Sequence, residues 1–328
     1  MAVLVTGGAG YIGSHMVLEL CDAGEKVIVL DNLSTGFDWA IDARANLVKG
    51  NAGDVDLVLN VIKEHDIKEV IHFAGSIVVP ESVVNPLKYY ENNTCVTRNL
   101  IEAAVKGKVK HFIFSSTAAV YGMVGLEPVS EDKPLNPASP YGRSKLMSEM
   151  MLADTSAAHP ITYGALRYFN VAGADSKGRI GQSTPQATHL IKVATQTALG
   201  QRDHIDVFGS DYDTPDGTCV RDYIHISDLI NAHVLLLNYL RKGGQNKILN
   251  CGYGQGYSVN QVINMVKQVC AIDFDVRHVE RRDGDPASVV AQSKKLKELL
   301  NWQPQNDDLE KMVRSAYAWE KHLMMRNR

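Results

Sequence analysis

The chain opens on AVLVTGGAGYIG (residues 2–13), a short apolar run followed directly by glycines in the spacing G-x-x-G-x-x-G. Glycine has no Cβ, so a strand that ends in such a turn can fold back tightly and bring its backbone close to a ligand. The helix predicted over 11–23 then offers free N–H groups and the positive end of its dipole. The stretch therefore predicts a pyrophosphate-binding turn between a strand and a helix.

An acidic residue supports the same interpretation. The next predicted strand, 26–30, is followed by Asp31, close to the distance of roughly 20 residues at which a carboxylate meets the adenosine ribose. A carboxylate there accepts hydrogen bonds from the ribose hydroxyls and repels a 2′-phosphate. No arginine follows in residues 32–36 to bind such a phosphate. The sequence thus predicts a dinucleotide site that favours NAD over NADP.

Outward from this turn, short β-branched runs alternate with helical patterns. Strands are predicted over 46–49, 69–73, 111–116 and 161–168, and helices over 54–64, 83–106 and 141–157. Parallel strands need crossover connections, which helices supply. The alternation therefore predicts an α/β fold with a doubly wound parallel sheet of the Rossmann type, covered by helices on both faces.

After residue 170 the rhythm loosens into glycine- and aspartate-bearing loops over 173–186 and 208–223. Helices are predicted over 187–199, 227–241, 258–270, 293–300 and 307–323, with strands near 205–208, 247–251 and 274–279. We expect residues 1–170 to form the cofactor domain and 171–328 to form a smaller, interleaved substrate-binding region. Segments near 227–251 are expected to return to the parent sheet.

Composition excludes several classes of protein. The 328 residues carry 34 Lys and Arg against 37 Asp and Glu, and this balance offers no basic field for nucleic acid and no polybasic membrane anchor. No run approaches the ~18 apolar residues of a membrane span, so a cytoplasmic protein is expected. The five cysteines have no C-x-x-C pair and the histidines no ligand spacing, so neither a disulfide framework nor a metal site is predicted.

Candidate catalytic residues lie farther along the chain. Tyr141 and Lys145 form a Y-x-x-x-K pair inside a helix announced by Ser139 and Pro140. Four residues apart, they project from one helix face, and the lysine charge is expected to lower the pKa of the tyrosine so that it acts as a general base. Thr117 follows strand 111–116 and would place a hydroxyl at the carboxyl edge of the sheet, where open α/β sheets hold ligands.

Taken together, these motifs resemble the extended short-chain dehydrogenase/reductase family, and within it the epimerases of nucleotide sugars. The likeness is carried by the glycine turn, Asp31, HFAG (72–75), FSSTAAVYG (114–122), SPYGRSK (139–145), RYFNVAGA (167–174), CVRDYIH (219–225), CGYGQGYSV (251–259), RRDGDPAS (281–288) and LNW (300–302), and spans essentially the whole chain. It implies an NAD-dependent isomerase of galactose metabolism. Such an enzyme interconverts UDP-glucose and UDP-galactose through a 4-keto intermediate, as a homodimer.

The resemblance also implies a role for each matching position. Tyr141 would be the base, Lys145 would bind the nicotinamide ribose and acidify the tyrosine, and Thr117 would bond the sugar O4. NAD would be lined by these three residues and by Gly7, Gly10, Tyr11, Ile12, Gly13, Asp31, Asn32, Ser34, Thr35, Gly36, Asn51, Ala52, Phe73, Ala74, Gly75, Asn92 and Phe169. The UDP-sugar would be held by Asn170, His189, Leu190, Phe208, Arg221, Arg282, Asp285 and Val289.

The chain departs from the family pattern in places. It reads Lys49-Gly50-Asn51-Ala52 where the family often has an aspartate at the adenine-binding turn, which leaves open whether Asn51 or Asp54 acts there. Ile77 stands where some members have a lysine. At Val289 the family gates the sugar C2 substituent, and a valine of intermediate size leaves open whether N-acetylated sugars are accepted.

Other functions remain as alternatives. A nucleotide-sugar 4,6-dehydratase needs an acid and a base, supplied in relatives by Asp-Glu after the threonine, whereas Ala118 and Ala119 follow Thr117 here. An epimerase of another nucleotide sugar, such as UDP-N-acetylglucosamine, or a nucleotide-sugar reductase would keep the same base. A non-enzymatic NAD-sensing scaffold would be expected to lose Tyr141 or Lys145, and both are present.

Overall fold

The computed structural model describes residues 2–184, 187–282 and 284–326, which form two compact units. Unit 1 comprises Met1–Gly122, Leu135–Arg167 and Ile230–Leu249, and unit 2 comprises Met123–Pro134, Tyr168–Leu229 and Asn250–Arg328. The chain therefore passes between the units several times. No helix within the described residues is long and apolar enough to cross a membrane, and a cytoplasmic location stays a prediction.

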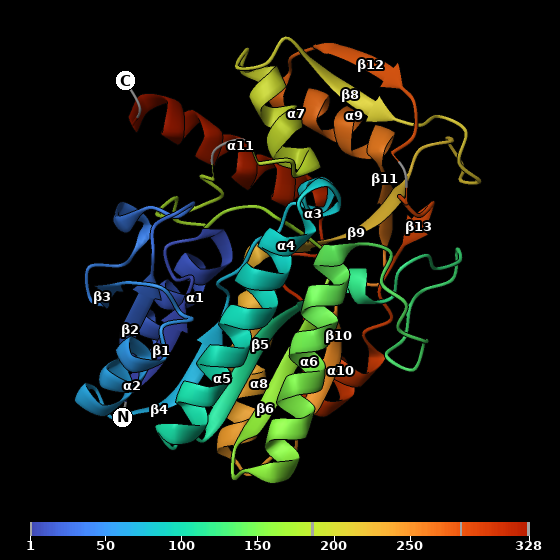
Figure 1. Ribbon diagram of the computed structural model, residues 1–328. Helices are drawn as coiled ribbons and strands as arrows, with labels where there is room; N and C mark the ends of the chain where they lie inside the picture. Colours follow the sequence, from blue (N-terminus) through green and yellow to red (C-terminus); the bar gives the residue numbers. More distant parts are fainter. Residues whose placement is uncertain (1, 185–186, 283, 327–328) are drawn as a thin grey trace. The chain divides into compact units, whose positions relative to one another are not determined.

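Unit 1 is built on a seven-stranded sheet in the order β10-β6-β5-β4-β1-β2-β3 (Figure 1). Its strands are β1 (Ala2–Thr6), β2 (Lys26–Asp31), β3 (Asn46–Lys49), β4 (Ile67–His72), β5 (His111–Thr117), β6 (Thr162–Tyr168) and β10 (Lys247–Cys251). The pairs β1–β2, β1–β4, β2–β3 and β4–β5 are parallel. The predicted α/β fold with a doubly wound parallel sheet is confirmed, and its strand order reverses between β1 and β4, where such sheets bind ligands.

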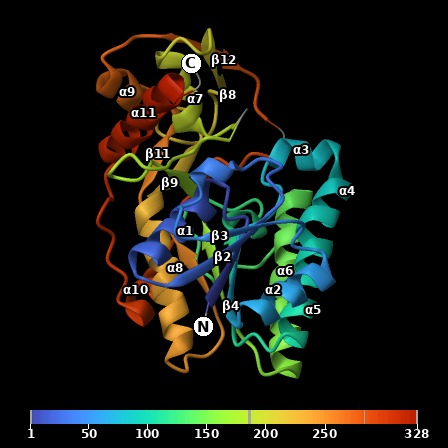
Figure 2. The ribbon, with the colours of Figure 1, turned by 90° about the vertical axis from the view of Figure 1, so that its left-hand side faces the viewer.

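Helices cover both faces of this sheet (Figure 2). One face carries α1 (Tyr11–Asp22) and α8 (Ile226–Arg241), and the other carries α2 (Val55–Glu64), α5 (Val96–Lys106) and α6 (Pro140–Ala158). Because both faces are covered, the central strands are apolar throughout, and β1 is buried along its whole length. This packing fixes the carboxyl ends of β1, β4 and β5, which carry the predicted cofactor residues.

The single helix predicted over 83–106 is wrong. The structure has α3 (Val79–Val84), α4 (Pro86–Tyr89) and a π-helical segment, η2 (Tyr90–Cys95), before α5. Pro86 causes the first break, since a residue before proline avoids the helical conformation, and Asn85 adopts φ −134° and ψ 65°. The wide turns of η2 then displace Asn92 and Asn93 from a regular helical register.

Unit 2 centres on β9 (Val220–His225), a strand placed within a predicted loop, so that part of the prediction is wrong. β9 pairs with β7 (Asn170–Ala172), β11 (Gly256–Ser258) and β13 (Ser288–Val289), while β8 (His204–Phe208) pairs with β12 (Asp275–Val279). The remaining helices of unit 2 are α7 (Leu190–Ala198), α9 (Val259–Cys270), α10 (Lys294–Leu300) and α11 (Leu309–Arg326). The sequence of β9 contains polar residues that are typical of a loop. One of them, Asp222, is in fact fully buried, and its carboxylate accepts hydrogen bonds from the backbone N–H groups of Tyr253, Gly254 and Ala291.

Candidate functional site

The glycine turn after β1 is as tight as its sequence predicts. Gly7 has φ +73°, and a Cβ on it would lie 2.5 Å from the backbone nitrogen of Ala74. A Cβ on Gly13 would lie 2.1 Å from the carbonyl oxygen of Gly7. Gly10 begins α1 without a side-chain cap, and the first turn has no acidic residue, so the helix N-terminus is suited to an anion. This cradle fits a dinucleotide pyrophosphate.

Asp31 lies directly beside the glycine turn, at the end of β2. Its Oδ2 accepts a hydrogen bond from the backbone nitrogen of Ala9 at 2.9 Å, and its Oδ1 accepts one from Leu33 at 2.8 Å. The carboxylate therefore joins the turn to the segment that follows β2, which includes Asn32, Ser34, Thr35 and Gly36. The residue is 9% exposed, as befits an acid held at the wall of a site rather than in bulk solvent.

The turn after β3 is closed by its own side chains. Asn51 Oδ1, the oxygen expected on an adenine amino group, accepts from the backbone nitrogen of Gly53 at 2.8 Å. Asp54 caps α2 by accepting from the backbone nitrogen of Leu57 at 3.0 Å. The structure thus gives Asp54 a helix-capping contact, and Ala52 beside it is buried.

The predicted catalytic residues of unit 1 lie together and are buried. Ser139 accepts from the backbone nitrogen of Gly142 at 3.2 Å and starts α6, with Pro140 in its first turn. Tyr141 is 8% exposed and is hydrogen bonded to the side chain of Thr117. Lys145 is 4% exposed, and its Nζ donates to the carbonyl oxygen of Ser115 at 2.9 Å. A phenol, a hydroxyl and an ammonium group are therefore held in one place by β5 and α6.

The expected lowering of the tyrosine pKa is wrong for the chain by itself. Burial raises the pKa of Tyr141 above its ordinary value, and the Thr117 hydrogen bond opposes that rise only in part. Lys145 donates its hydrogen bond to the Ser115 carbonyl. Burial lowers the pKa of Lys145 to about 8, and the charge of Glu149 acts in the opposite direction. Burial also lowers the pKa of His72 to about 3, so this neighbour on β4 is neutral near pH 7.

Asn93 is a residue of this site that sequence analysis missed. Its Oδ1 accepts from the backbone nitrogen of Ser76 at 2.7 Å, and its Nδ2 donates to Ser76 O and to Ser144 Oγ, both at 3.0 Å. Asn92 beside it donates to Ser76 Oγ at 3.1 Å. Asn93 therefore ties the loop after β4, which carries Phe73, Ala74 and Gly75, to α6. The signal in the sequence was the Asn-Asn pair after Pro86, but its position depends on the π-helical turn.

In unit 2, three of the predicted substrate residues lie together. Arg221 Nη2 donates to Asp285 Oδ1 at 2.8 Å. The parallel pairing of β13 with β9 places Val289 opposite Arg221, so the two side chains share a face of the sheet. This cluster joins a cation, a carboxylate and a small apolar side chain across residues far apart in sequence.

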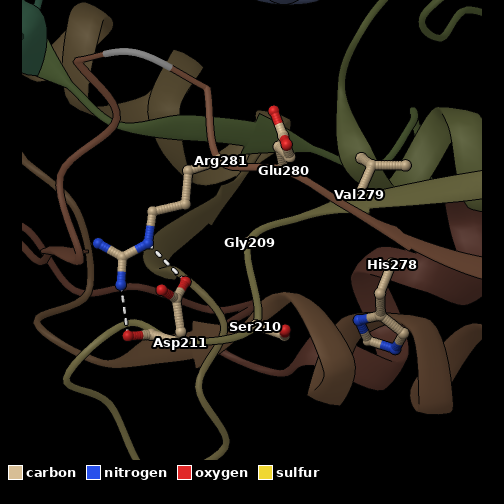
Figure 3. Close-up of a pocket in the computed structure, with 7 residues that line it drawn as sticks. All are labelled: Gly209, Ser210, Asp211, His278, Val279, Glu280 and Arg281. Atoms are coloured by element: carbon tan, nitrogen blue, oxygen red, sulfur yellow. Dashed lines mark hydrogen bonds and ion pairs between the residues drawn. The ribbon is translucent and has the colours of Figure 1, made fainter.

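A second pair in unit 2 is formed by Phe208 and Arg282. The Arg282 guanidinium lies 3.6 Å from the centroid of the Phe208 ring. Beside these residues, the ends of β8 and β12 line a hollow with Gly209, Ser210, Asp211, His278, Val279, Glu280 and Arg281 (Figure 3). Across this hollow, Arg281 Nε donates to Asp211 Oδ1 at 2.6 Å, which fastens one loop to the other.

The other predicted substrate residues occupy separate places in unit 2. Asn170 starts β7 opposite Tyr223 on β9, and Phe169 precedes it. His189 and Leu190 begin α7, which packs against β8. Within the described part of the chain, no hydrogen bond or ion pair joins His189 to Arg221 or to Arg282.

Known proteins that are similar to this chain include NAD-binding epimerases, in agreement with the geometry of the glycine turn. The family model of the NAD dependent epimerase/dehydratase family matches residues 3–252. A UDP-glucose 4-epimerase of Azospirillum brasilense is 52% identical, over 98% of this chain and 92% of that protein. A UDP-glucose 4-epimerase of Brucella ovis, solved in complex with NAD, is 40% identical with a TM-score of 0.94 and covers 97% of both chains. The UDP-Glc/GlcNAc 4-epimerase of Campylobacter jejuni is 46% identical with a TM-score of 0.85, over 98% of this chain and 99% of that one.

Proposed function

The chain belongs to the NAD dependent epimerase/dehydratase family, and from that premise we propose that it interconverts UDP-glucose and UDP-galactose by inverting carbon 4 of the sugar. The observation that carries the proposal is the buried group of Tyr141, Thr117 and Lys145 at the end of β5. Relatives named as UDP-glucose 4-epimerases over nearly the whole chain support it.

NAD is the cofactor of this proposal, and the residues of unit 1 fit it. The glycine turn would hold the pyrophosphate, Asp31 the adenosine ribose, and the loop of Phe73, Ala74 and Gly75 the nicotinamide half. When bound, NAD supplies a hydride acceptor that takes the hydride of sugar C4 and gives it back. Because the hydride returns, NAD is a bound catalyst and is not consumed.

The residues of the chain move the proton. Tyr141 takes the proton of the sugar 4-hydroxyl as the C4–H bond breaks and returns it when the opposite epimer forms. Thr117, already hydrogen bonded to Tyr141, orients the same sugar oxygen. Lys145 contributes a positive charge that favours the ionised phenol. Burial of the three groups excludes water, which would otherwise hydrate the 4-keto intermediate.

Unit 2 provides the candidate UDP-sugar residues. Arg221 and Arg282 suit the two phosphates, since guanidinium forks match phosphate oxygens, and Phe208 offers an aromatic face to the base. Asp285 holds Arg221 in place through its ion pair. Asn170, His189 and Leu190 would complete the binding of the nucleotide sugar. The nucleotide must stay bound while the keto sugar turns over, so these contacts are expected to matter more than contacts to the sugar hydroxyls.

One assay tests the proposal directly. Purified protein is given UDP-galactose with no added NAD, and UDP-glucose is quantified as the product. Formation of UDP-glucose is expected because the cofactor is regenerated in every turnover. Absence of product with and without added NAD would contradict the proposal, and release of a 4-keto-6-deoxy sugar would indicate the dehydratase alternative.

A second substrate is proposed from Val289. Its place opposite Arg221 lies in the cluster assigned to the nucleotide sugar, and its side chain is smaller than an aromatic one. We propose that UDP-N-acetylglucosamine is accepted as a secondary substrate. The similarity to a UDP-Glc/GlcNAc 4-epimerase supports this, although that name describes the Campylobacter jejuni protein.

We also propose that the protein is a homodimer. Helices α3, α4 and α6 pack against one another in unit 1 and expose apolar side chains. The exposed apolar residues include Val83, Val84, Leu87, Met147 and Met150. Such a patch marks an interaction surface, and a second copy of the same helices would cover it in a symmetric pairing. Light scattering at the monomer mass across a dilution series would contradict a dimer.

A further inference from the structure

The face of α6 that carries Tyr141 and Lys145 continues to a third buried group. Tyr141, Lys145 and Glu149 are spaced four residues apart, so they follow one another along one side of the helix. Glu149 is 2% exposed and plays no part in the proton transfer described above. Burying a carboxylate destabilises a protein unless the charge is paired and hydrogen bonded, so Glu149 is expected to have specific partners.

The partners of Glu149 come from two strand ends of unit 1. Arg167 at the end of β6 donates through Nε to Oε1 at 2.9 Å and through Nη2 to Oε2 at 2.6 Å, which makes a bidentate pair. Ser116 of β5 donates to Oε1 at 2.5 Å. Arg167 Nη1 also donates to the Tyr121 hydroxyl at 3.0 Å. The carboxylate therefore binds α6 to β5 and β6 directly beneath the catalytic residues.

We propose that Glu149 is a positioning residue for the proposed epimerase reaction. Bound by Arg167 and Ser116, it holds α6 against β5. Its negative charge, one helical turn from Lys145, favours the protonated form of that lysine. The inference rests on the proposed function. Ser116 lies between Ser115, whose carbonyl binds Lys145, and Thr117, which bonds Tyr141. One clamp thus sets both contacts of the catalytic pair.

The groups around Lys145 support an electrostatic role for Glu149. Burial opposes the charged lysine and lowers its pKa to about 8, and the charge of Glu149 acts in the other direction. Other charged or titratable groups face this region from neighbouring elements of the described chain. They are His72 on β4, Tyr163 and Arg167 on β6, Tyr121 after β5, Tyr141 on α6, and Tyr89 on α4, which is bonded to Glu81 of α3. His72 is neutral near pH 7, and the charge of Glu149, which its ion pair with Arg167 holds in place, raises the pKa of Lys145.

The test compares Glu149→Gln with the wild type, as purified. The titration of the Lys145 Nζ is followed by nitrogen NMR on lysine-labelled protein, and kcat and KM for UDP-galactose are measured from pH 6 to pH 9. The charge of Glu149 raises the pKa of Lys145, so the Lys145 midpoint is expected to fall by about one pH unit when that charge is removed. Consequently kcat should fall about five- to tenfold at pH 8 and less at pH 6, with KM nearly unchanged.

A matched control and a second variant keep the test decisive. Glu69→Gln removes the carboxylate of another bidentate pair in unit 1, with Arg241, and should leave both the Lys145 midpoint and kcat unchanged. The double variant Glu149→Met, Arg167→Met replaces the pair with apolar side chains, which often preserves folding. It should fold and lower the Lys145 midpoint by less than Glu149→Gln does, because the opposing charge of Arg167 is removed as well, and it replaces Glu149→Gln if that protein is unfolded.

Two results would overturn the inference. The first is an unchanged Lys145 midpoint in a folded variant, and the second is a loss of kcat that is equal at every pH, which would mean a purely structural role. Failure of the proposed function is separately visible, because the wild type would then not convert UDP-galactose, whereas the lysine titration needs no substrate.

Discussion

The candidate residues of unit 1 and unit 2 differ in how they are held. Tyr141, Lys145 and Thr117 are each less than a tenth exposed and are fixed by a sheet and a long helix. In unit 2, the Arg221 and Asp285 side chains are 14% and 34% exposed, and Arg282 is exposed on a loop. The buried residues of unit 1 depend on its core, whereas the less buried residues of unit 2 depend mainly on pairwise contacts.

This difference has a consequence for function. Groups that move protons must keep one geometry and one protonation state, which a packed core enforces. Groups that recognise a ligand can lie on loops and short strands, where substitutions are tolerated and specificity can change. We therefore expect substitutions in unit 1 to alter kcat and substitutions in unit 2 to alter KM.

The largest effect is expected for Tyr141→Phe. The variant removes the proton acceptor with little change in packing, so kcat should fall by about 10² to 10⁴ while NAD stays bound. Turnover of UDP-galactose and the absorbance of bound cofactor measure the two effects. If the variant turned over UDP-galactose at the wild-type rate, Tyr141 would not be the base. The expected difference between unit 1, where substitutions alter kcat, and unit 2, where they alter KM, would then fail.

Next comes Arg221→Met in unit 2. Loss of a charge-assisted contact to phosphate and of the Asp285 ion pair should raise KM about 10- to 100-fold with a smaller change in kcat. Arg314→Met is the matched control, because Arg314 forms an exposed ion pair with Glu310 on α11. A fall in kcat with unchanged KM would place Arg221 with the catalytic residues instead.

Asp222 tests whether unit 2 has a rigid core of its own. Burial raises the pKa of Asp222 to about 6, so between pH 4 and pH 6 the folded protein binds more protons than the unfolded chain. Stability should therefore fall by about 3 kcal/mol as the pH rises through this range and then level off. Urea unfolding at several pH values measures it.

Asp222→Asn should abolish that pH dependence. The amide nitrogen would face backbone donors, so the variant should be less stable than the wild type at pH 4 by about 1–3 kcal/mol, and the wild type should lose this advantage as the pH rises to 7. Asp213→Asn, at an exposed position of unit 2, is the control. A parallel dependence in variant and wild type would assign the effect to other groups.

The smallest effect is expected for Val289→Tyr. A larger side chain opposite Arg221 should reduce kcat/KM for UDP-N-acetylglucosamine about tenfold and leave that for UDP-glucose nearly unchanged, since a steric difference of this kind contributes about 1–3 kcal/mol. Parallel assays of both sugars measure the ratio. If the wild type shows no activity on the N-acetylated sugar, or the ratio is unchanged in the variant, Val289 does not control sugar size.

The sequence alone determined the features that depend on local chemistry. The glycine turn, Asp31, the cap of α6 and the Tyr141–Lys145 spacing are read from neighbouring residues, because backbone sterics and helix periodicity act over a few positions. Strand and helix alternation was likewise enough to predict the parallel sheet. Local rules could not anticipate the π-helical turn that places Asn93 beside Ser144.

Only the tertiary structure decided which distant groups meet and how burial changes them. β9 could not be recognised from the sequence, because an aspartate such as Asp222 is expected to face solvent. The backbone groups that pair with Asp222 in the interior lie 31 to 69 residues away along the chain. The pKa of Tyr141 was predicted in the wrong direction because desolvation depends on packing and not on spacing. The Glu149–Arg167 pair and the Arg221–Asp285 pair join residues 18 and 64 positions apart, which only the folded chain brings within hydrogen-bonding distance.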